Sequence, residues 1–492
     1  MNKSSVVLLA AASAALAQGP HVCGDLMGHK AAGMTVQISK AEPSSAANLP
    51  PHCRVDGVID PRVGVDGKSY GIGFALALPT NWNGRFLFQG GGGLNGTVGA
   101  PVGAQAAGGS PALTRGFAVV STDSGHKGSA FDGSFMRDQQ AALDFYYVAI
   151  GKVALAAKEM IAWYYGRAAG HSYYDGCSTG GREGMIMSQR YPAYFDGIIS
   201  GDPAIRTGYS NLALSNIAAA YAKAAPGGAL LSDAERKLIV KSLLDECDAK
   251  DGLADGMIFN MGACKFDPAA LECKGPKTEQ CLSRSQVEAL NTAFAGPKSL
   301  YGDPFYPGFP YDAGIDEGTG LPGLLRGPRI PVQTGADFAH FDVDKEAARI
   351  AANPGALLGD STWTNLSTFA GAGGKLIFYH GLSDPWFSPW DTLEYYERMG
   401  KDTAASSPVA SWSRLFLVPG MGHCGGGSAT LDRFDMLTAI VDWVEKGKAP
   451  DSVIATGRAF SGRSRPLCPY PQHAQYSGEG DPNDSANFVC QN

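Results

Sequence analysis

Short apolar runs alternate with longer helix-like stretches along most of this chain, and this alternation constrains the fold more than any other feature. A helix is predicted over 140–166, and strand-like runs lie at 85–91, 116–125, 172–178, 195–201, 375–381 and 414–420. Apolar strands separated by helices form parallel sheets that are covered on both faces. We therefore expect an α/β fold with a doubly wound, mostly parallel sheet.

The alternation stops between residues 204 and 373. This interval contains four cysteines, clusters of proline, glycine and aromatic residues such as 301–314, and no clear series of strands. Because the strand pattern resumes afterwards, an insertion explains the interval better than a separate domain does. We expect a discontinuous core domain, 18–203 and 374–492, with 204–373 inserted as a lid domain.

The first residues have the pattern of a cleaved signal peptide. Lys3 supplies positive charge, 6–14 is apolar, and 15–17 is a small-x-small cleavage site. The apolar run is too short to span a bilayer, and no later segment is apolar for long enough. We expect 1–17 to be removed and the mature protein to be secreted or periplasmic, with no membrane partner.

The charge balance argues against a nucleic-acid partner. The chain has 40 Lys plus Arg against 47 Asp plus Glu, a formal net charge of −7, and no basic run. Binding to a phosphate backbone requires a basic surface. Nothing in the sequence indicates the oligomeric state.

The ten cysteines of an exported chain predict disulfide bonds, because oxidising compartments allow such bonds to persist. The absence of any Cys-x-x-Cys pair argues against a thiolate metal site. Neighbours in the sequence would pair as Cys23–Cys53, Cys247–Cys264, Cys273–Cys281 and Cys468–Cys490. Cys177 and Cys424 remain, far apart in the sequence.

The pattern Gly-x-Ser-x-Gly occurs twice, around Ser178 and around Ser69, so the pattern alone identifies no nucleophile. In α/β-hydrolases the nucleophilic serine occupies a tight turn between a strand and a helix. Ser178 ends the strand-like run 172–178 and precedes a plausible helix, 181–192. Ser69 precedes an alternating strand with no helix behind it. Ser178 is the predicted nucleophile, and Ser69 is interpreted as a chance match.

A serine nucleophile needs a histidine to accept its proton and a carboxylate to orient that histidine, in the chain order Ser, Asp/Glu, His. Asp384 follows the strand-like run 375–381, and His423 lies on a glycine-rich loop after the last such run. An N-cap or turn role is the alternative for Asp384. His380 precedes the acid, breaks the order and is interpreted as structural. The set predicts a serine hydrolase with an α/β-hydrolase core as its catalytic domain.

Each end of this set has a cysteine neighbour. Cys177 precedes the nucleophile and Cys424 follows the histidine. A disulfide between them would keep the two loops within reach of each other. Two unrelated free thiols are the alternative, which an oxidising compartment disfavours.

The reaction also requires two backbone N–H donors for the oxyanion. Thr179, directly after the nucleophile, supplies the first. The glycine-rich stretch 85–96 supplies the second, with Gly90 preferred and Gly91 as the alternative.

Together, Cys177-Ser178, Asp384 and His423-Cys424 resemble the Cys-Ser/Asp/His-Cys motif of the tannase and feruloyl esterase family. The similarity extends along almost the whole mature chain and includes 81–93, 176–185, 247–258, 380–400, 432–451 and 465–472. The stretches 178–185 and 465–472 are also similar to the family's bacterial mono(2-hydroxyethyl) terephthalate hydrolase branch. The resemblance implies an α/β-hydrolase core with a lid, and hydrolysis of hydroxycinnamic or gallic acid esters, or in that branch of terephthalic acid esters.

The stretch 247–258 suggests a cation site in the lid. Its aspartates offer the oxygen ligands that calcium prefers, but the spacing is not that of an EF-hand, and a plain acidic turn is the alternative. The segment resembles the family's calcium loop. That resemblance implies a structural Ca²⁺ bound by side chains of Asp248, Asp251 and Asp255 and by carbonyls of Leu253 and Met257. No organic cofactor is expected.

Substrate recognition depends on aromatic and basic side chains near the lid. Arg326 and Arg329 are the nearby candidates for binding a terephthalate carboxylate, and neither is clearly placed to do so. The aromatic residues that could stack on a phenolic ring are Tyr301, Phe305, Tyr306, Phe309, Trp363, Trp386 and Phe387.

We therefore expect a feruloyl-type ester of a small aromatic acid as the substrate, including esters attached to plant cell-wall polysaccharide. Gallate esters and terephthalate monoesters are the alternatives. A non-catalytic secreted binding protein on the same scaffold is a more distant one.

Overall fold

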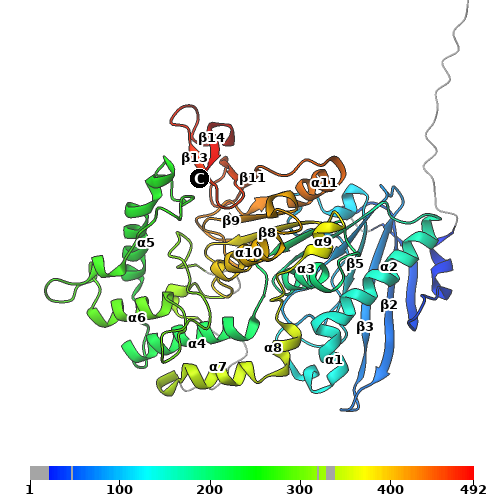
Figure 1. Ribbon diagram of the computed structural model, residues 1–492, viewed down its shortest axis with the longest axis horizontal. Helices are drawn as coiled ribbons and strands as arrows, with labels where there is room; N and C mark the ends of the chain where they lie inside the picture. The colour runs from blue at the N-terminus through cyan, green and yellow to red at the C-terminus, as the bar shows by residue number, and fades with distance from the viewer. Residues whose placement is uncertain (1–20, 46–47, 318–320, 329–337) are drawn as a thin grey trace, which may run out of the picture.

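The computed structural model of the protein describes residues 21–45, 48–317, 321–328 and 338–492 (Figure 1). The predicted signal peptide, 1–17, and Arg329 lie outside these residues. Within the described ranges, no helix is long and apolar enough to cross a bilayer.

A nine-stranded mixed sheet forms the centre of the fold, in the order β1-β2-β3-β5-β4-β6-β7-β8-β9. The neighbours from β5 to β9 are parallel, whereas β1, β2, β3 and β5 pair antiparallel in that order. The strands are β1 (Val36–Ser44), β2 (His52–Val63), β3 (Ser69–Pro79), β4 (Arg85–Gln89), β5 (Ala118–Thr122), β6 (His171–Cys177), β7 (Gly197–Gly201), β8 (Lys375–Gly381) and β9 (Ser413–Val418).

Helices cover both faces of the sheet. On β8, Leu376 and Phe378 face the apolar cluster that contains α2, α3 and α10, whereas Ile377 and Tyr379 face the cluster that contains α11. Burial on both faces explains why these strands are continuous apolar runs in the sequence. The six predicted runs coincide with β4 to β9, although β6 and β9 each begin one residue earlier than predicted, and the α/β architecture is confirmed.

The predicted helix 140–166 is also present, as α1, a π-helical turn (Asp144–Val148) and α2 in succession. The helices are α1 (Gln139–Leu143), α2 (Ala149–Tyr165), α3 (Thr179–Arg190), α4 (Thr207–Ala224), α5 (Asp233–Cys247), α6 (Arg284–Phe294), α7 (Val343–Ala351), α8 (Pro354–Gly359), α9 (Ser367–Gly371), α10 (Pro389–Thr403) and α11 (Met436–Lys446).

Helices α4 to α9 lie between β7 and β8 in the sequence, within the interval expected to be inserted; α4 to α7 lie to the left of the sheet in Figure 1. The expected limits, at 203/204 and 373/374, fall in the loops before α4 and before β8. Helices α4, α5 and α6 bury apolar residues in a shared cluster. Trp386 and Phe387, which follow β8, belong to this cluster, so the inserted segment packs on the loop after β8.

The apolar pattern does not reveal the first two strands or the small C-terminal sheets. Strand β1 forms the sheet's edge and has no fully buried residue, although Val36, Ile38 and Ala41 pack against the core, so its apolar pattern is weak. The C-terminal strands are too short for a period to be recognised. They are β10 (Arg433–Phe434), β11 (Val453–Thr456), β12 (Ser464–Leu467), β13 (His473–Tyr476) and β14 (Phe488–Gln491).

Candidate active site

Four polar side chains follow the carboxyl ends of four neighbouring parallel strands. Ser178 follows β6, Asp202 follows β7, Asp384 follows β8, and His423 lies on the loop after β9. Because parallel strands end at one edge of the sheet, residues far apart in the sequence meet there. This edge is where open α/β sheets place their ligand sites.

Ser178 occupies the turn between β6 and α3, with φ 64° and ψ −121°. A positive φ costs energy in any residue other than glycine, so the surrounding turn must hold it. Close approach of the backbone requires the flanking glycines: a Cβ on Gly176 would lie 2.8 Å from the Gly180 backbone, and one on Gly180 would lie 2.7 Å from the Gly91 carbonyl oxygen. This is the geometry of a nucleophile elbow.

Ser69 has a different setting. It is the exposed first residue of β3, which pairs with β2 and β5, and the next element is β4. Of the two matches to Gly-x-Ser-x-Gly, only Ser178 lies between a strand and a helix.

Asp384 and His423 are directly hydrogen-bonded, with 2.7 Å between Nδ1 and Oδ2. The other carboxylate oxygen, Oδ1, accepts the N–H groups of Trp386 at 2.8 Å and Phe387 at 3.1 Å. Asp384 is 1% exposed, and these donors satisfy its buried carboxylate. With Nδ1 engaged by Asp384, Nε2 of His423 is left to accept a proton.

Two further titratable groups, Asp202 and His380, are buried beside this pair. Nε2 of His380 lies 3.4 Å from Asp384 Oδ2 and 3.7 Å from Asp202 Oδ1. Burial disfavours the imidazolium of His423, but Asp384 and Asp202 outweigh this effect and raise the pKa of His423. Burial likewise opposes ionisation of Asp384, but His423 and His380 outweigh it and lower the pKa of Asp384. The cluster therefore favours an ionised Asp384 next to His423 and increases the proton affinity of His423.

Sequence reasoning missed Asp202 and treated His380 as structural. Nδ1 of His380 contacts Thr392 Oγ1 at 2.8 Å, and Nε2 contacts the Phe387 carbonyl oxygen at 3.0 Å. Asp202 accepts the Gly381 N–H at 2.8 Å. The position of Asp202, directly after a predicted strand, is the signal that could have found it.

All ten cysteines are paired as expected, including Cys177 with Cys424. That bond has a Cα–Cα distance of 5.9 Å and a sequence separation of 247. It joins the residue before Ser178 to the residue after His423. The elbow and the histidine loop are therefore covalently linked.

Removing this bond should destabilise the protein. For a Cys177→Ala/Cys424→Ala variant we expect the free energy of unfolding to fall by about 2–5 kcal/mol, because the bond restricts a very long loop of the unfolded chain. Chemical denaturation measures the change. The matched control is Cys273→Ala/Cys281→Ala, whose bond has a separation of 8; loop-closure entropy predicts a loss about 3 kcal/mol smaller. Equal losses from the two variants would contradict the prediction.

The N–H groups of Gly90 and Gly91 are both occupied, so the prediction of Gly90 as an oxyanion donor is wrong. Gly90 donates to the Asp175 carbonyl oxygen at 2.9 Å, which extends the pairing of β4 with β6. Gly91 donates to Glu183 Oε2 at 3.0 Å.

The next two residues of the loop have free N–H groups. Those of Gly92 and Gly93 donate no hydrogen bond within the part of the chain that the structure describes, and both residues line the cavity that holds Ser178 and His423. Thr179 is the first residue of α3, where a helix leaves its N–H groups without an intrahelical acceptor. Free donors are thus present on both sides of Ser178.

Glu183 of α3, which sequence reasoning also missed, anchors this glycine loop. It is fully buried, and its carboxylate accepts hydrogen bonds from Gly91, from Asn95 Nδ2 at 3.3 Å, from Ser124 Oγ at 3.0 Å and from the Tyr174 hydroxyl at 2.9 Å. Four donors satisfy the buried carboxylate and fix the loop against the helix that follows Ser178.

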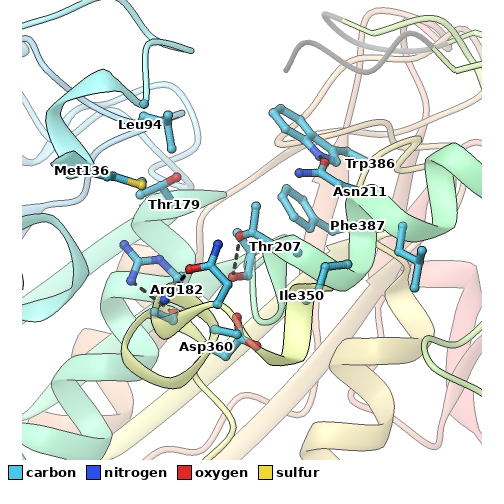
Figure 2. A pocket seen from close by; sticks show the side chains of 18 of the residues that line it. Leu94, Met136, Thr179, Arg182, Thr207, Asn211, Ile350, Asp360, Trp386 and Phe387 are labelled. Atoms are coloured by element: carbon cyan, nitrogen blue, oxygen red, sulfur yellow. Dashed lines mark hydrogen bonds between the residues drawn. The ribbon is translucent and has the colours of Figure 1, made fainter. Parts of the chain in front are cut away.

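Two cavities meet at Ser178. The first, about 810 Å³, is lined by the glycine loop 90–93, Trp386 and His423. The second, about 530 Å³, is lined by Thr179, Trp386 and Phe387 and extends to Ile350 of α7 and Asp360 after α8 (Figure 2). Both have the size of sites for small molecules.

Of the aromatic residues that could stack on a substrate ring, Trp386 and Phe387 line these cavities. Arg326 pairs with Asp316 at 3.1 Å and lines neither cavity. The other five predicted stacking residues lie outside these cavities. Tyr306 and Phe309 are buried, Phe305 is partly buried, and Tyr301 and Trp363 are exposed.

Among the described residues, one acidic group beside Ser178 has the spacing of possible metal ligands. Asp202, Asp384 and His423 bring ligand atoms within 4.8 Å of one another, although two of these atoms already bond to each other. The predicted calcium residues Asp248, Asp251 and Asp255 lie on the turn after α5 and do not form such a group.

The turn after α5 contains a carboxylate that is only partly satisfied. Asp248 Oδ2 accepts the Gly256 N–H at 2.8 Å, but its buried Oδ1 has no hydrogen-bond partner among the described residues. Burial raises the pKa of Asp251 to about 7, and Asp255 pairs with Arg465. An orphaned carboxylate oxygen beside two other aspartates fits a hard cation.

The comparisons with known proteins agree with this geometry. The family model "Tannase and feruloyl esterase" matches residues 53–325 and 328–491. The chain is 40% identical to a mono(2-hydroxyethyl) terephthalate hydrolase of Piscinibacter sakaiensis, over 91% of this chain and 86% of that protein. It is 32% identical to a probable feruloyl esterase B-2 of Aspergillus terreus, over 84% of this chain and 82% of that protein.

The crystal structure of feruloyl esterase B from Aspergillus oryzae superposes with a TM-score of 0.77 at 26% identity, covering 95% of this chain and 99% of that one. Tannin acyl hydrolase from Aspergillus niger shares the fold, with a TM-score of 0.72 at 22% identity over 93% and 90% of the two chains. The chain therefore belongs to the tannase and feruloyl esterase family, whose members are carboxylic ester hydrolases.

Proposed function

We propose that the protein is a secreted serine esterase that cleaves esters of hydroxycinnamic and related phenolic acids. The observation that carries the proposal is the 2.7 Å hydrogen bond between His423 Nδ1 and Asp384 Oδ2, at a cavity that also contains Ser178. Membership of a family of carboxylic ester hydrolases supports the reaction class.

In acylation, Ser178 Oγ attacks the ester carbonyl carbon while His423 Nε2 takes the hydroxyl proton. Asp384 holds the imidazole through Nδ1 and stabilises its positive charge. The oxyanion accepts hydrogen bonds from the N–H of Thr179 and from a free N–H of the loop 92–93. Collapse of the intermediate breaks the ester C–O bond, passes the proton from His423 to the leaving alcohol and leaves the acyl group on Ser178.

In deacylation, water replaces the alcohol on the His423 side. His423 takes a proton from the water while the water oxygen attacks the acyl carbon. His423 then gives that proton to Ser178 Oγ as the carboxylic acid departs. The Cys177–Cys424 bond supports both steps, because it limits the relative motion of the nucleophile and the base.

The names of the relatives support an aromatic acyl group. They include feruloyl esterases and a mono(2-hydroxyethyl) terephthalate hydrolase, and Trp386 and Phe387 offer aromatic faces beside Ser178. The 40% identity to the terephthalate hydrolase makes terephthalate monoesters the second candidate, and gallate esters the third. The inserted segment 204–373 would act as the lid over this substrate.

A substrate panel tests the acyl specificity. We expect kcat/KM to be at least about 10-fold higher for methyl ferulate or methyl caffeate than for methyl gallate or mono(2-hydroxyethyl) terephthalate, since one matched polar contact is worth about 1.4 kcal/mol or more. A highest value for the terephthalate ester would replace the first candidate with the second. No hydrolysis of any ester, together with no labelling by a serine-directed phosphonate, would contradict the esterase proposal.

We further propose that the protein is exported after removal of residues 1–17. Five disulfide bonds support this, because such bonds persist in oxidising compartments. N-terminal sequencing of the mature protein tests the cleavage site.

The aspartates on the turn after α5 are proposed to bind a structural Ca²⁺, with the carbonyls of Leu253 and Met257 completing the ligands. The orphaned Oδ1 of Asp248 supports this proposal. When bound, the ion would neutralise neighbouring buried carboxylates. It would also stabilise the turn where Asp255 pairs with Arg465 and so joins the inserted segment to the C-terminal sheet.

Removing Ca²⁺ should therefore lower the melting temperature. With a chelator we expect Tm to fall by about 2–4 °C, because a bound ion contributes a few kcal/mol to the folded state of a chain of this length. Re-addition of Ca²⁺ should restore Tm, and Asp251→Asn should abolish the response. An unchanged Tm and no calcium in the purified protein would refute the site.

A further inference from the structure

The two cavities at Ser178 can be assigned to the two halves of an ester. His423 lines the larger cavity and not the smaller one. Since His423 protonates the leaving alcohol, the alcohol must lie on the side of His423. The acyl group then extends into the smaller cavity, which Thr179, Trp386 and Phe387 line.

Asp360, directly after α8, lines this acyl cavity and lies across it from Trp386 and Leu94 in Figure 2. Hydrogen bonds fix the backbone on both sides of it. Arg182 donates to the Gly359 carbonyl oxygen at 3.4 Å, and Gln189 Nε2 donates to the Ser361 carbonyl oxygen at 3.0 Å. The backbone that carries the Asp360 side chain is therefore fixed on both sides.

The cations around this end of the cavity already have other partners. Arg182 also donates to the carbonyl oxygens of Phe145 and Tyr146. Arg349 pairs with Glu346 at 2.7 Å, and Arg206 pairs with Asp391.

The Asp360 carboxylate itself has no hydrogen bond or ion pair with any residue that the structure describes. Burial raises the pKa of Asp360 to about 7. The charges of Arg206 and Arg182 offset the lost hydration of this half-buried carboxylate only in part, so a ligand that supplies a hydrogen-bond donor is stabilised there.

We propose that Asp360 determines acyl specificity by accepting a hydrogen bond from a hydroxyl group on the aromatic ring, at the end away from the ester. This inference rests on the proposed function. It selects hydroxylated acyl groups over unsubstituted rings. Above its pKa, where Asp360 is ionised, it also disfavours an acyl group that ends in a carboxylate, because two anions would then face each other in the cavity.

The test compares methyl 4-hydroxycinnamate, methyl cinnamate and mono(2-hydroxyethyl) terephthalate. For the wild type we expect kcat/KM to be about 10- to 100-fold higher for the hydroxylated cinnamate than for methyl cinnamate. Asp360→Leu should remove most of this preference, and Asp360→Asn, which keeps a neutral acceptor, should remove part of it. In both variants methyl cinnamate should stay within about 2-fold of wild type. At about pH 8.5, where wild-type Asp360 is ionised, the variants should hydrolyse the terephthalate ester faster than the wild type does.

Glu346→Gln is the matched control, because Glu346 lines the same cavity but already pairs with Arg349. It should keep the wild-type preference. The inference is overturned if the wild type shows no preference for the hydroxyl, or if the Asp360 variants lose activity on both cinnamates equally. A wild type that hydrolyses none of the three esters would instead overturn the proposed function.

Discussion

Replacing Ser178 with alanine is expected to lower kcat on methyl ferulate by roughly 10⁴- to 10⁶-fold, the loss that follows removal of a catalytic nucleophile. Without Oγ no acyl-enzyme forms, and only binding and oxyanion stabilisation remain. Steady-state kinetics measure the loss, and mass spectrometry after phosphonate treatment should detect no adduct. Tm should change little, because Ser178 makes no side-chain cap to α3.

The chain supplies its own control for this variant. Ser69→Ala alters the other Gly-x-Ser-x-Gly match, at the exposed start of β3, and should leave kcat unchanged. A Ser178→Ala variant that retained more than about one per cent of the wild-type kcat would rule out Ser178 as the nucleophile.

Replacing Asp384 with asparagine is expected to lower kcat by about 10⁴-fold. Asparagine can keep the shape of the site and the contacts to the N–H groups of Trp386 and Phe387. It cannot supply the negative charge that orients the Nδ1 proton of His423 and stabilises the imidazolium. The measurement is kcat with methyl ferulate, with circular dichroism to verify folding.

Asp202→Asn is the matched control, since Asp202 is equally buried but does not hydrogen-bond to His423. We expect a loss of less than about 10-fold. Its pH profile should nevertheless change. The charge of Asp202 raises the pKa of His423, and the base must be neutral to act, so removing that charge should move the acid limb of kcat/KM to lower pH. A loss as large as that of Asp384→Asn would contradict the assignment of the acid.

The proposed catalytic residues could be predicted because their signals are local. Ser178, Asp384 and His423 each follow an apolar run that is buried on both faces of the sheet, and such runs are recognisable in the sequence. Eight cysteines could be assigned to disulfide bonds because each has its partner nearby in the sequence. The two that remained, Cys177 and Cys424, then had to form the long-range pair. The order of strands then brings the three residues to one edge.

The unpredicted features depend on contacts between distant segments. Whether Gly90 or Gly92 has a free N–H depends on where the pairing of β4 with β6 ends, which no local pattern encodes. Asp360 follows a six-residue helix in the inserted segment, and only the packing of that helix over the acyl cavity gives the carboxylate its role. The edge strand β1 has no fully buried residue, and its weak apolar pattern does not mark it.

The Cys177–Cys424 bond has one more consequence. It closes a covalent ring that contains Ser178, Asp384, His423 and the entire segment between β7 and β8. A protease that cuts an exposed loop of that segment would therefore produce a nicked molecule held together as one piece, and no fragment carrying a proposed catalytic residue could diffuse away. If the protein is exported as proposed, this single bond lets it survive a cut in the inserted segment.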